Sequence, residues 1–304
     1  MSGFVPEQIC DTIRFSQYHG DRNIAHYCGY ASDFISQVKE DDAIDGAVFP
    51  KSCDSSRIIS SYLKNTGKFI FQIPVPMNDE VDFFADIIKK YKEAVENHYG
   101  ISITNVVERA SMINARNLKI KELYDNLGEI SFSEYLSVIH ELLKRPLYEQ
   151  HIPDIFKQVS KGKPVFIIGS FLSNIEIVKK LELSGLQVVG DTLTESGRIA
   201  SLPLVRLEGD IYREISQSFL DGRLSPSQNN FKAIIKADLE EMKYKGIKGV
   251  VFITQKYCEP YDFLYSIYKT ILDKNEIPSV KISLDDTENT GKAELALEAF
   301  ESMI

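Results

Sequence analysis

The sequence predicts an α/β protein with parallel sheets, built in two similar halves. Residues 249–254 form an apolar run without alternation, which is typical of a strand covered on both faces of a parallel sheet. The run leads through a turn into a helical pattern at Cys258, and the same order of strand, turn, cysteine and helix occurs roughly 200 residues earlier at Cys53. Residues 165–189 are predicted to form a complete strand–helix–strand unit.

Length and composition fit two domains, each with its own core. The chain has 304 residues, of which 43% are hydrophobic, so two α/β domains can each bury a core. We expect an N-terminal α/β domain with a helical connector over residues 1–157 and a C-terminal α/β domain over residues 158–304. The chain has only four cysteines, which excludes a disulfide scaffold and fits a reducing cytoplasm.

Charge and hydropathy exclude two classes of partner. The net charge is −9 and no basic cluster interrupts it, so we expect no nucleic-acid partner. No apolar run approaches the roughly 20 residues that span a bilayer, so we expect no membrane partner. The first residues, Met-Ser-Gly-Phe-Val-Pro-Glu, do not form a signal peptide. The expected location is cytoplasmic.

The first half begins with a short predicted helix over residues 4–18, where Cys10 is interpreted as a small buried hydrophobe. Cys28 precedes a second helical pattern, residues 31–38. The strand at 46–49 ends in a Pro-Lys-Ser turn, and Cys53 stands at its tip. The following elements are a helix over 55–64 and a strand over 68–73, which Pro74 ends.

Residues 79–157 are helical almost throughout by pattern, and we interpret them as a scaffold that links the halves. Ser131-Phe-Ser-Glu134 matches a capping box at the start of one of these helices. His98, His140 and His151 are scattered, and we interpret them as ordinary surface or core residues.

The second half places several loops after predicted strands. Gly169-Ser170 follows the strand at 165–168, and the Asp191–Arg198 loop follows the strand at 186–189. Pro260 after Cys258 suits a first helical turn, where Glu259 and Asp262 complement the helix dipole. The remaining predicted elements are helices at 174–183, 209–219 and 229–245, a strand at 279–282 and a last helix that ends at Phe300.

The cysteines carry the strongest chemical signal. The turn at Gly169-Ser170 lacks G-x-G-x-x-G and a Walker lysine, so a dinucleotide site is not predicted. No close C-x-x-C pair indicates zinc, and no histidine lies near Cys53 or Cys258 in sequence to activate a nucleophile. Three thiols at loop or strand tips, Cys28, Cys53 and Cys258, suit an iron–sulfur cluster with one open iron. Three unrelated buried thiols are the alternative.

The residues resemble those of the 2-hydroxyacyl-CoA dehydratase subunit family, which also includes benzoyl-CoA reductase subunits. Val5-Pro6-Glu7 resembles its Pro-Glu motif, and Cys28 lies where its first cluster cysteine does. Phe49-Pro-Lys-Ser-Cys53-Asp54 and Lys256-Tyr-Cys258-Glu-Pro260 are similar to the segments of the second and third cysteines. Gly190-Asp191 to Gly197-Arg198 and Thr290-Gly291 to Glu301 match two further motifs, so the likeness spans nearly the whole chain.

The resemblance implies two flavodoxin-like (Rossmann-like) domains with a [4Fe–4S] cluster held between them by Cys28, Cys53 and Cys258. Such subunits form heterodimers with a homologous subunit, and an ATP-dependent iron–sulfur activator supplies one electron. The electron reduces the thioester carbonyl of a 2-hydroxyacyl-CoA to a ketyl radical, which expels hydroxide and loses a β-proton. The electron is then returned, so the expected net reaction is dehydration to a 2-enoyl-CoA.

Further residues are expected near the cluster because they follow predicted strands. Ser170, Asp191, Gln255 and Lys256 are candidates for contact with the acyl-CoA substrate or for support of the cluster ligands. Glu7, in the Pro-Glu motif, is the candidate for positioning substrate or moving a proton, with a helix-capping role as the alternative.

The chain departs from the family at its amino end. It begins a few residues before the Pro-Glu motif, and the interval between Glu7 and Cys28 is compressed, so part of the acyl-CoA pocket is expected to be missing. Two alternatives therefore stay open. One is a noncatalytic electron-relay or structural subunit, and the other is a benzoyl-CoA reductase-like subunit in which the electron stays with the product.

Overall fold

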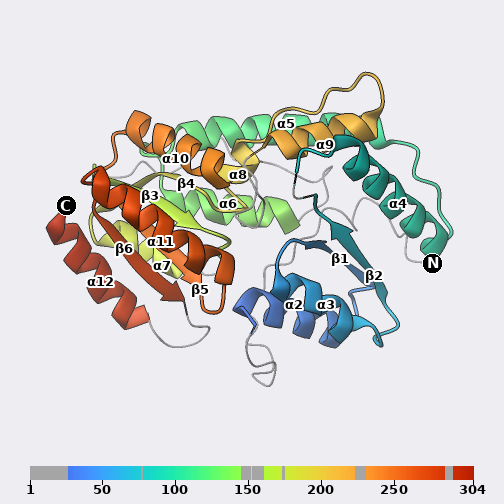
Figure 1. Cartoon of the computed structure of the whole chain (residues 1–304), viewed down its shortest axis with the longest axis horizontal. Coiled ribbons are helices and arrows are strands. Elements are labelled where there is room, and N and C mark those ends of the chain that lie inside the picture. The colour runs from blue at the N-terminus through green and yellow to red at the C-terminus, as the bar shows by residue number, and fades with distance from the viewer. Residues whose placement is uncertain are drawn as a thin grey trace. The chain divides into compact units, whose positions relative to one another are not determined.

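The structure is a computed structural model that describes residues 27–76, 78–144, 152, 161–172, 175–222, 231–284 and 290–304. The predicted helix over residues 4–18 lies outside these residues. Within them the architecture is α/β with two parallel sheets, as the sequence predicts (Figure 1). The chain divides into two compact units. The first comprises Met1–Leu118, Leu143–Gln150 and Ser201–Phe231, and the second Lys119–Leu142, His151–Ala200 and Lys232–Ile304.

The first unit contains a parallel pair of strands, β1 (Gly46–Lys51) and β2 (Phe69–Pro74). Helix α3 (Asp54–Leu63) connects them, and α2 (Gly29–Glu40) packs on α3. Helix α4 (Val81–Tyr99) packs on β2 and on α9 (Ile211–Asp221). The strands predicted at 46–49 and 68–73 and the helices predicted at 31–38 and 55–64 are therefore confirmed, with ends that differ by one or two residues.

Aromatic side chains fill the spaces between these elements. The rings of Phe34 and Phe49 lie 5.7 Å apart between α2 and β1, and those of Phe84 and Phe219 lie 5.1 Å apart between α4 and α9. Lys89 on α4 forms an ion pair of 2.9 Å with Asp210, the residue before α9. Both partners are well exposed, so packing of the rings contributes more to this contact than the charges do.

The second unit contains a four-stranded parallel sheet in the order β4-β3-β5-β6. The strands are β3 (Lys163–Gly169), β4 (Leu186–Asp191), β5 (Gly249–Gln255) and β6 (Ser279–Leu284). Every residue of β5 is buried, which confirms the prediction of a strand covered on both faces. Because the strands are parallel, the loops that carry Ser170, Asp191 and Cys258 leave the sheet at the same edge.

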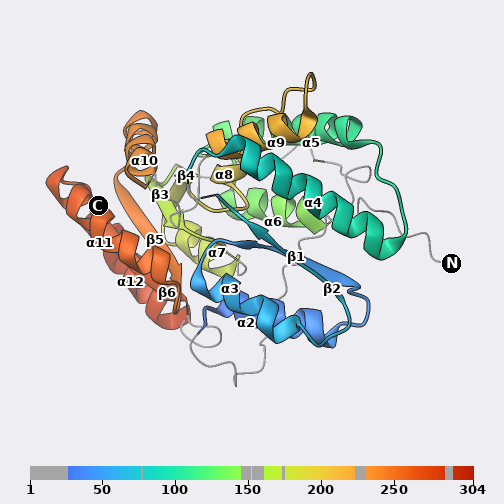
Figure 2. The same ribbon diagram turned by 45° about the vertical axis from the view of Figure 1, so that its right-hand side comes forward.

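Helices cover both faces of this sheet. Right-handed crossovers require α7 (Glu176–Leu183), which joins β3 to β4, and α11 (Glu259–Lys274), which joins β5 to β6, to lie on opposite faces. In Figure 2 they are seen on opposite sides of β5 and β6. The last helix, α12 (Thr290–Met303), packs on α7 and β6. Helix α10 (Phe231–Lys245) precedes β5, and α8 (Gly197–Ala200) is a single turn after β4.

The predicted helical scaffold is divided into three described helices: α4, α5 (Val106–Asp125) and α6 (Phe132–Lys144). Helix α4 ends at Gly100, whose φ of +65° is a left-handed conformation that glycine adopts without strain. Ser131 Oγ accepts from the backbone N–H of Glu134, which is half of the predicted capping box. None of the helices in the described part of the chain combines the length and apolar character that crossing a membrane requires.

Candidate functional site

All three predicted cluster cysteines stand at the start of a helix. Cys28 is the N-cap residue of α2, Cys53 of α3 and Cys258 of α11. None of these thiols is in a disulfide. The first turn of a helix presents backbone N–H groups and the positive end of the helix dipole, which favour negative charge. Each cysteine therefore occupies a position that suits a thiolate ligand.

Cys28 and Cys53 both influence the pKa of one tyrosine in the first unit, Tyr30. The pKa of Tyr30 is raised to about 12, chiefly by burial of its hydroxyl and to a smaller extent by the Cys28 and Cys53 thiols. Tyr30 as a residue remains 41% exposed. Its ring stacks on Phe34 at 6.2 Å. The contact between α2 and α3 thus brings two of the three cysteines to the same side chain.

Ser56 fixes the backbone around Cys53. Its hydroxyl accepts from the backbone N–H groups of Ser52 and Cys53, both at 3.0 Å, and donates to the Cys53 carbonyl at 2.8 Å. The helix predicted over residues 55–64 is confirmed as α3, and Ser56 is the residue that closes the turn before it.

Cys258 follows a tight turn at the carboxyl end of β5 in the second unit. Its N–H donates to the Gln255 carbonyl at 3.1 Å, and Tyr257 between them has a φ of +64°. A bulky residue is strained in this left-handed region. Lys256 Nζ lies 5.2 Å from the centroid of the Tyr257 ring, and the Lys256 N–H bonds to Leu284 on β6. The turn is therefore anchored to the neighbouring strand.

Arg198 contacts the first turn of the helix that Cys258 begins. The guanidinium donates to the Tyr261 hydroxyl, and its Cζ lies 5.7 Å from the centroid of that ring. Burial raises the pKa of Tyr261; Arg198 opposes this shift and the Cys258 thiol adds to it. Tyr261 is only 4% exposed, so the cation and the thiol act on a desolvated hydroxyl.

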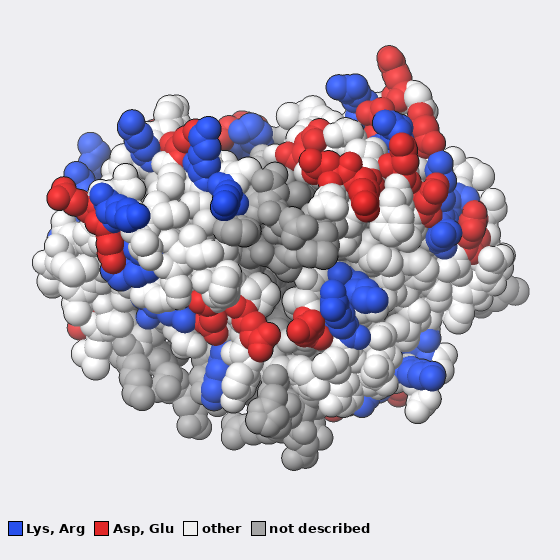
Figure 3. All heavy atoms as spheres, viewed as in Figure 1, with Lys and Arg blue, Asp and Glu red and all other residues white. Residues whose placement is uncertain are grey.

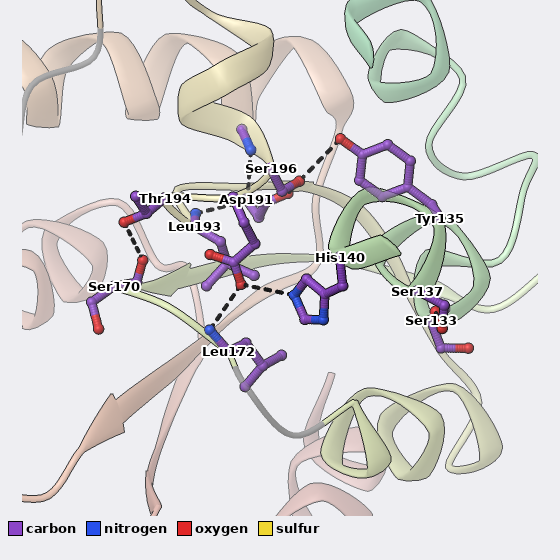
Figure 4. A network of polar contacts seen from close by, with 12 residues as sticks. Ser133, Tyr135, Ser137, His140, Ser170, Leu172, Asp191, Leu193, Thr194 and Ser196 are labelled. Carbon is purple, nitrogen blue, oxygen red and sulfur yellow. Dashed lines mark hydrogen bonds and ion pairs between the residues drawn. The ribbon is translucent and has the colours of Figure 1, made fainter. Parts of the chain in front are cut away.

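A buried carboxylate, Asp191, organises the loop after β4 (Figure 4). Its Oδ1 accepts from the backbone N–H groups of Leu193 at 2.7 Å and Gly197 at 3.0 Å, and its Oδ2 accepts from the Ser196 hydroxyl at 2.6 Å. Asp191 is completely buried, and this burial raises its pKa to about 7 although the three hydrogen bonds oppose the shift. Asp191 thus holds the loop that carries Arg198.

The same loop is tied to the turn after β3. Ser170 accepts through its carbonyl from the Thr194 N–H at 2.8 Å, and Leu172 donates its N–H to Glu195 Oε1 at 2.8 Å. Glu195 Oε1 also lies 3.6 Å from Nε2 of His140 on α6 (Figure 4). Both side chains are almost fully buried. Polar contacts therefore join the turn after β3, the loop after β4 and helix α6. They lie at the edge of the sheet where β5 ends shortly before Cys258.

Across the described residues, no three His, Cys, Asp or Glu side chains gather closely enough to hold a metal ion. Cys28 and Cys53 belong to the first unit and Cys258 to the second.

Comparison with known proteins identifies the family. Residues 3–304 match the family model described as "2-hydroxyglutaryl-CoA dehydratase, D-component". The chain belongs to this family. Among its relatives, one of the benzoyl-CoA reductase subunits of Thauera aromatica is 24% identical over 280 residues, which cover 84% of this chain and 72% of the relative. The (R)-phenyllactyl-CoA dehydratase beta subunit of Clostridium sporogenes is 24% identical over 294 residues, which cover 86% of this chain and 75% of the relative.

The residues predicted to contact the substrate or to support the cysteines lie in one unit but differ in exposure. Ser170, Asp191, Gln255 and Lys256 all lie in the second unit, at the carboxyl ends of β3, β4 and β5. Asp191 is enclosed in its loop, Gln255 is 8% exposed, Ser170 is half-buried and Lys256 is exposed. Glu7 and Cys10 lie outside the described residues. The roles assigned to these residues stay predictions.

Sequence reasoning missed three residues of this dehydratase-family chain that the structure makes prominent. Tyr30 lies near both cysteines of the first unit, and Glu195 and His140 form a buried pair in the second. His140 was interpreted as an ordinary core or surface histidine, and it is indeed buried. No local pattern indicates its partner, because 55 residues separate His140 from Glu195 (195 − 140).

Gly197 should tolerate no larger side chain. A Cβ atom there would lie 2.0 Å from the Asp191 carbonyl oxygen, so Gly197→Ala is expected to destabilise the fold by about 3 kcal/mol through overpacking. Urea unfolding followed by circular dichroism measures this. Gly209→Ala is the control: the space around it is open and only its φ of +82° opposes a side chain, so the cost should be about 1 kcal/mol. Equal costs for the two variants would contradict the close approach at Gly197.

Proposed function

We propose that this chain is the iron–sulfur subunit of a 2-hydroxyacyl-CoA dehydratase and that Cys28, Cys53 and Cys258 hold a [4Fe–4S] cluster. The observation that carries the proposal is the shared setting of the three thiols. Each is an N-cap residue at a loop or strand end, and two of them, Cys28 and Cys53, raise the pKa of the same tyrosine, Tyr30. Thiolates in such positions are the ligands that iron–sulfur clusters use.

The donor set fits a cluster in its chemistry, because all three candidate ligands are soft thiols. We infer that each parallel sheet belongs to a flavodoxin-like domain, within the predicted ranges 1–157 and 158–304. The order β4-β3-β5-β6 supports this for the second sheet, because it corresponds to the first four strands of the flavodoxin order. When bound, the cluster would supply an open iron that acts as a Lewis acid toward the substrate.

The residues of the chain would hold and orient the reactants. The three helix starts favour the negative charge of the thiolates. The turn at Ser170 and the loop at Asp191 are fixed to each other by two hydrogen bonds, from the Thr194 N–H to the Ser170 carbonyl and from the Leu172 N–H to the Glu195 carboxylate. These bonds would present the Ser170 side chain to the acyl-CoA in a defined position. Glu7 remains the candidate for positioning the substrate or moving a proton. Gln255 and Lys256 remain candidates for contact with the substrate or for support of Cys258.

The reaction is dehydration through a ketyl radical. One electron, supplied by an ATP-hydrolysing iron–sulfur activator, reduces the thioester carbonyl; hydroxide leaves from C2, a β-proton is lost, and the electron returns. The products are a 2-enoyl-CoA and water. Both relatives carry names of enzyme subunits, which supports a heterodimer with a homologous subunit. We place the complex in the cytoplasm, whose reducing conditions keep cysteines such as Cys28, Cys53 and Cys258 out of disulfides. Figure 3 shows basic and acidic side chains interspersed on the described part of one face, and we infer no nucleic-acid partner.

A reductase subunit is the second candidate, because the benzoyl-CoA reductase and dehydratase relatives have the same identity to this chain. The assay combines the chain, its partner subunit, reduced activator and ATP with a 2-hydroxyacyl-CoA, and mass spectrometry follows the product. Loss of water without net reduction supports a dehydratase, and gain of two hydrogens supports a reductase. A cluster-bearing chain that adds nothing to turnover by its partner would favour a relay or structural subunit.

The cluster itself is tested by composition. Chain purified without oxygen is expected to be brown and to contain about four irons and about four acid-labile sulfides. Iron and sulfide assays with the absorbance spectrum measure this. Stoichiometric zinc without sulfide would falsify the cluster proposal.

A further inference from the structure

Arg198 lies where it can compensate negative charge at Cys258. Its guanidinium bonds to the hydroxyl of Tyr261, and Tyr261 stands three residues after Cys258 in the first turn of α11. Four charged or ionisable groups influence the pKa of this hydroxyl: Arg198, Cys258, Asp238 and Glu195. Of these four, only Arg198 is a cation.

The acidic groups around Tyr261 are buried. Asp238 is completely buried and accepts from the Tyr268 hydroxyl, and Glu195 is 2% exposed. Charges interact more strongly in such surroundings than in water. A thiolate at Cys258, and any electron added to a cluster bound there, would raise the negative charge further. Arg198 is therefore positioned to offset a real electrostatic cost.

The guanidinium is held in place before any ligand binds. The guanidinium donates to the Tyr261 hydroxyl and, through Nη1, to the Thr194 hydroxyl at 3.4 Å. The backbone N–H of Arg198 donates to the Leu193 carbonyl at 3.1 Å. The loop that carries Arg198 is closed by Asp191. A charge fixed in this way stabilises a new negative charge without reorganisation.

We propose that Arg198 is a positioning residue that, through Tyr261, raises the reduction potential of the cluster bound by Cys258. The inference rests on the proposed iron–sulfur function. Loss of a nearby cation makes the addition of an electron less favourable, so the potential must become more negative. Lys256 is the other cation close to Cys258 in sequence, but its side chain is exposed and lies against the Tyr257 ring, so water screens it more strongly.

The test is an EPR-monitored redox titration of the anaerobically purified chain. In Arg198→Gln the equilibrium constant for one-electron reduction is expected to fall about tenfold, which corresponds to about 59 mV. Arg198→Lys keeps the charge and should recover most of this difference. Tyr261→Phe keeps the ring but loses the hydroxyl, and should show an intermediate shift.

The matched control is Lys274→Gln, which removes one positive charge from the far end of the same helix, roughly 22 Å from its start. Its potential should equal that of the wild type. An Arg198→Gln cluster with full iron content and an unchanged potential would overturn the inference, and so would an Arg198→Lys shift as large as that of Gln. A wild-type chain that binds no iron refutes the proposed function, and this inference with it.

Discussion

Replacement of any one of Cys28, Cys53 or Cys258 by serine is expected to remove or convert the four-iron cluster and to reduce turnover to background. Serine offers a hard, neutral oxygen where iron–sulfur clusters use soft thiolates. Iron and sulfide per chain, EPR of the reduced protein and turnover with the partner subunit and activator measure the effect.

The position of the cysteines makes serine an informative substitution. All three are N-cap residues, and serine is among the residues preferred at that position. The helix starts should therefore survive, and the circular dichroism spectrum should stay that of the wild type. Loss of the cluster can then be assigned to the missing ligand rather than to unfolding.

Cys10→Ser is the matched control, because Cys10 is not part of the proposed ligand set. It should retain full iron content and turnover. If Cys10→Ser lost the cluster while Cys28→Ser kept it, the ligand set proposed here would be wrong.

Local sequence signals predicted where strands end and helices begin. The unbroken apolar run at 249–254 required burial on both faces, and every residue of β5 is buried. Pro260 and the acidic residues after Cys258 predicted the start of α11, which begins at Glu259. The equivalent signals at Cys53 predicted α3. These features depend on neighbours within one or two turns, so a single sequence contains them.

Contacts between distant segments could not be predicted in the same way. The pairing of His140 with Glu195 depends on how α6 packs over the β4 loop, and the convergence of Cys28 and Cys53 on Tyr30 depends on the contact of α2 with α3. The left-handed φ of Tyr257 runs against residue preference, so no propensity could indicate it. The two-domain interpretation came from the repeated order of strand, turn, cysteine and helix, and the ligand set came from the positions of the cysteines and the family resemblance, rather than from such contacts.

The second large effect concerns Asp191 and pH. Its pKa in the folded chain is about 7, raised from 3.8 chiefly by burial. Between these values the folded state keeps a proton that the unfolded state has already released, so this carboxyl makes stability fall as pH rises through the window. From about pH 5 to about pH 8 the loss is on the order of 3 kcal/mol. Above about pH 7 the contribution of Asp191 levels off.

Asp191→Asn should remove this part of the pH dependence. The amide oxygen can still accept from the Leu193 and Gly197 N–H groups, and the Ser196 hydroxyl can turn to accept from the amide. Urea unfolding of both proteins across this pH range gives the difference in unfolding free energy, which should shift toward the variant by about 3 kcal/mol as pH rises.

Asp210→Asn provides the control for this experiment. The hydrogen bond from Lys89 lowers the pKa of Asp210, so Asp210 stays ionised over the whole range and its removal should leave the pH dependence unchanged. Parallel pH profiles for the wild type and Asp191→Asn would show instead that Asp191 is ionised in the folded chain at every pH tested. The loop that carries Arg198 would then be held by a buried negative charge, and the hydrogen bonds from Leu193, Ser196 and Gly197 would have to outweigh its desolvation.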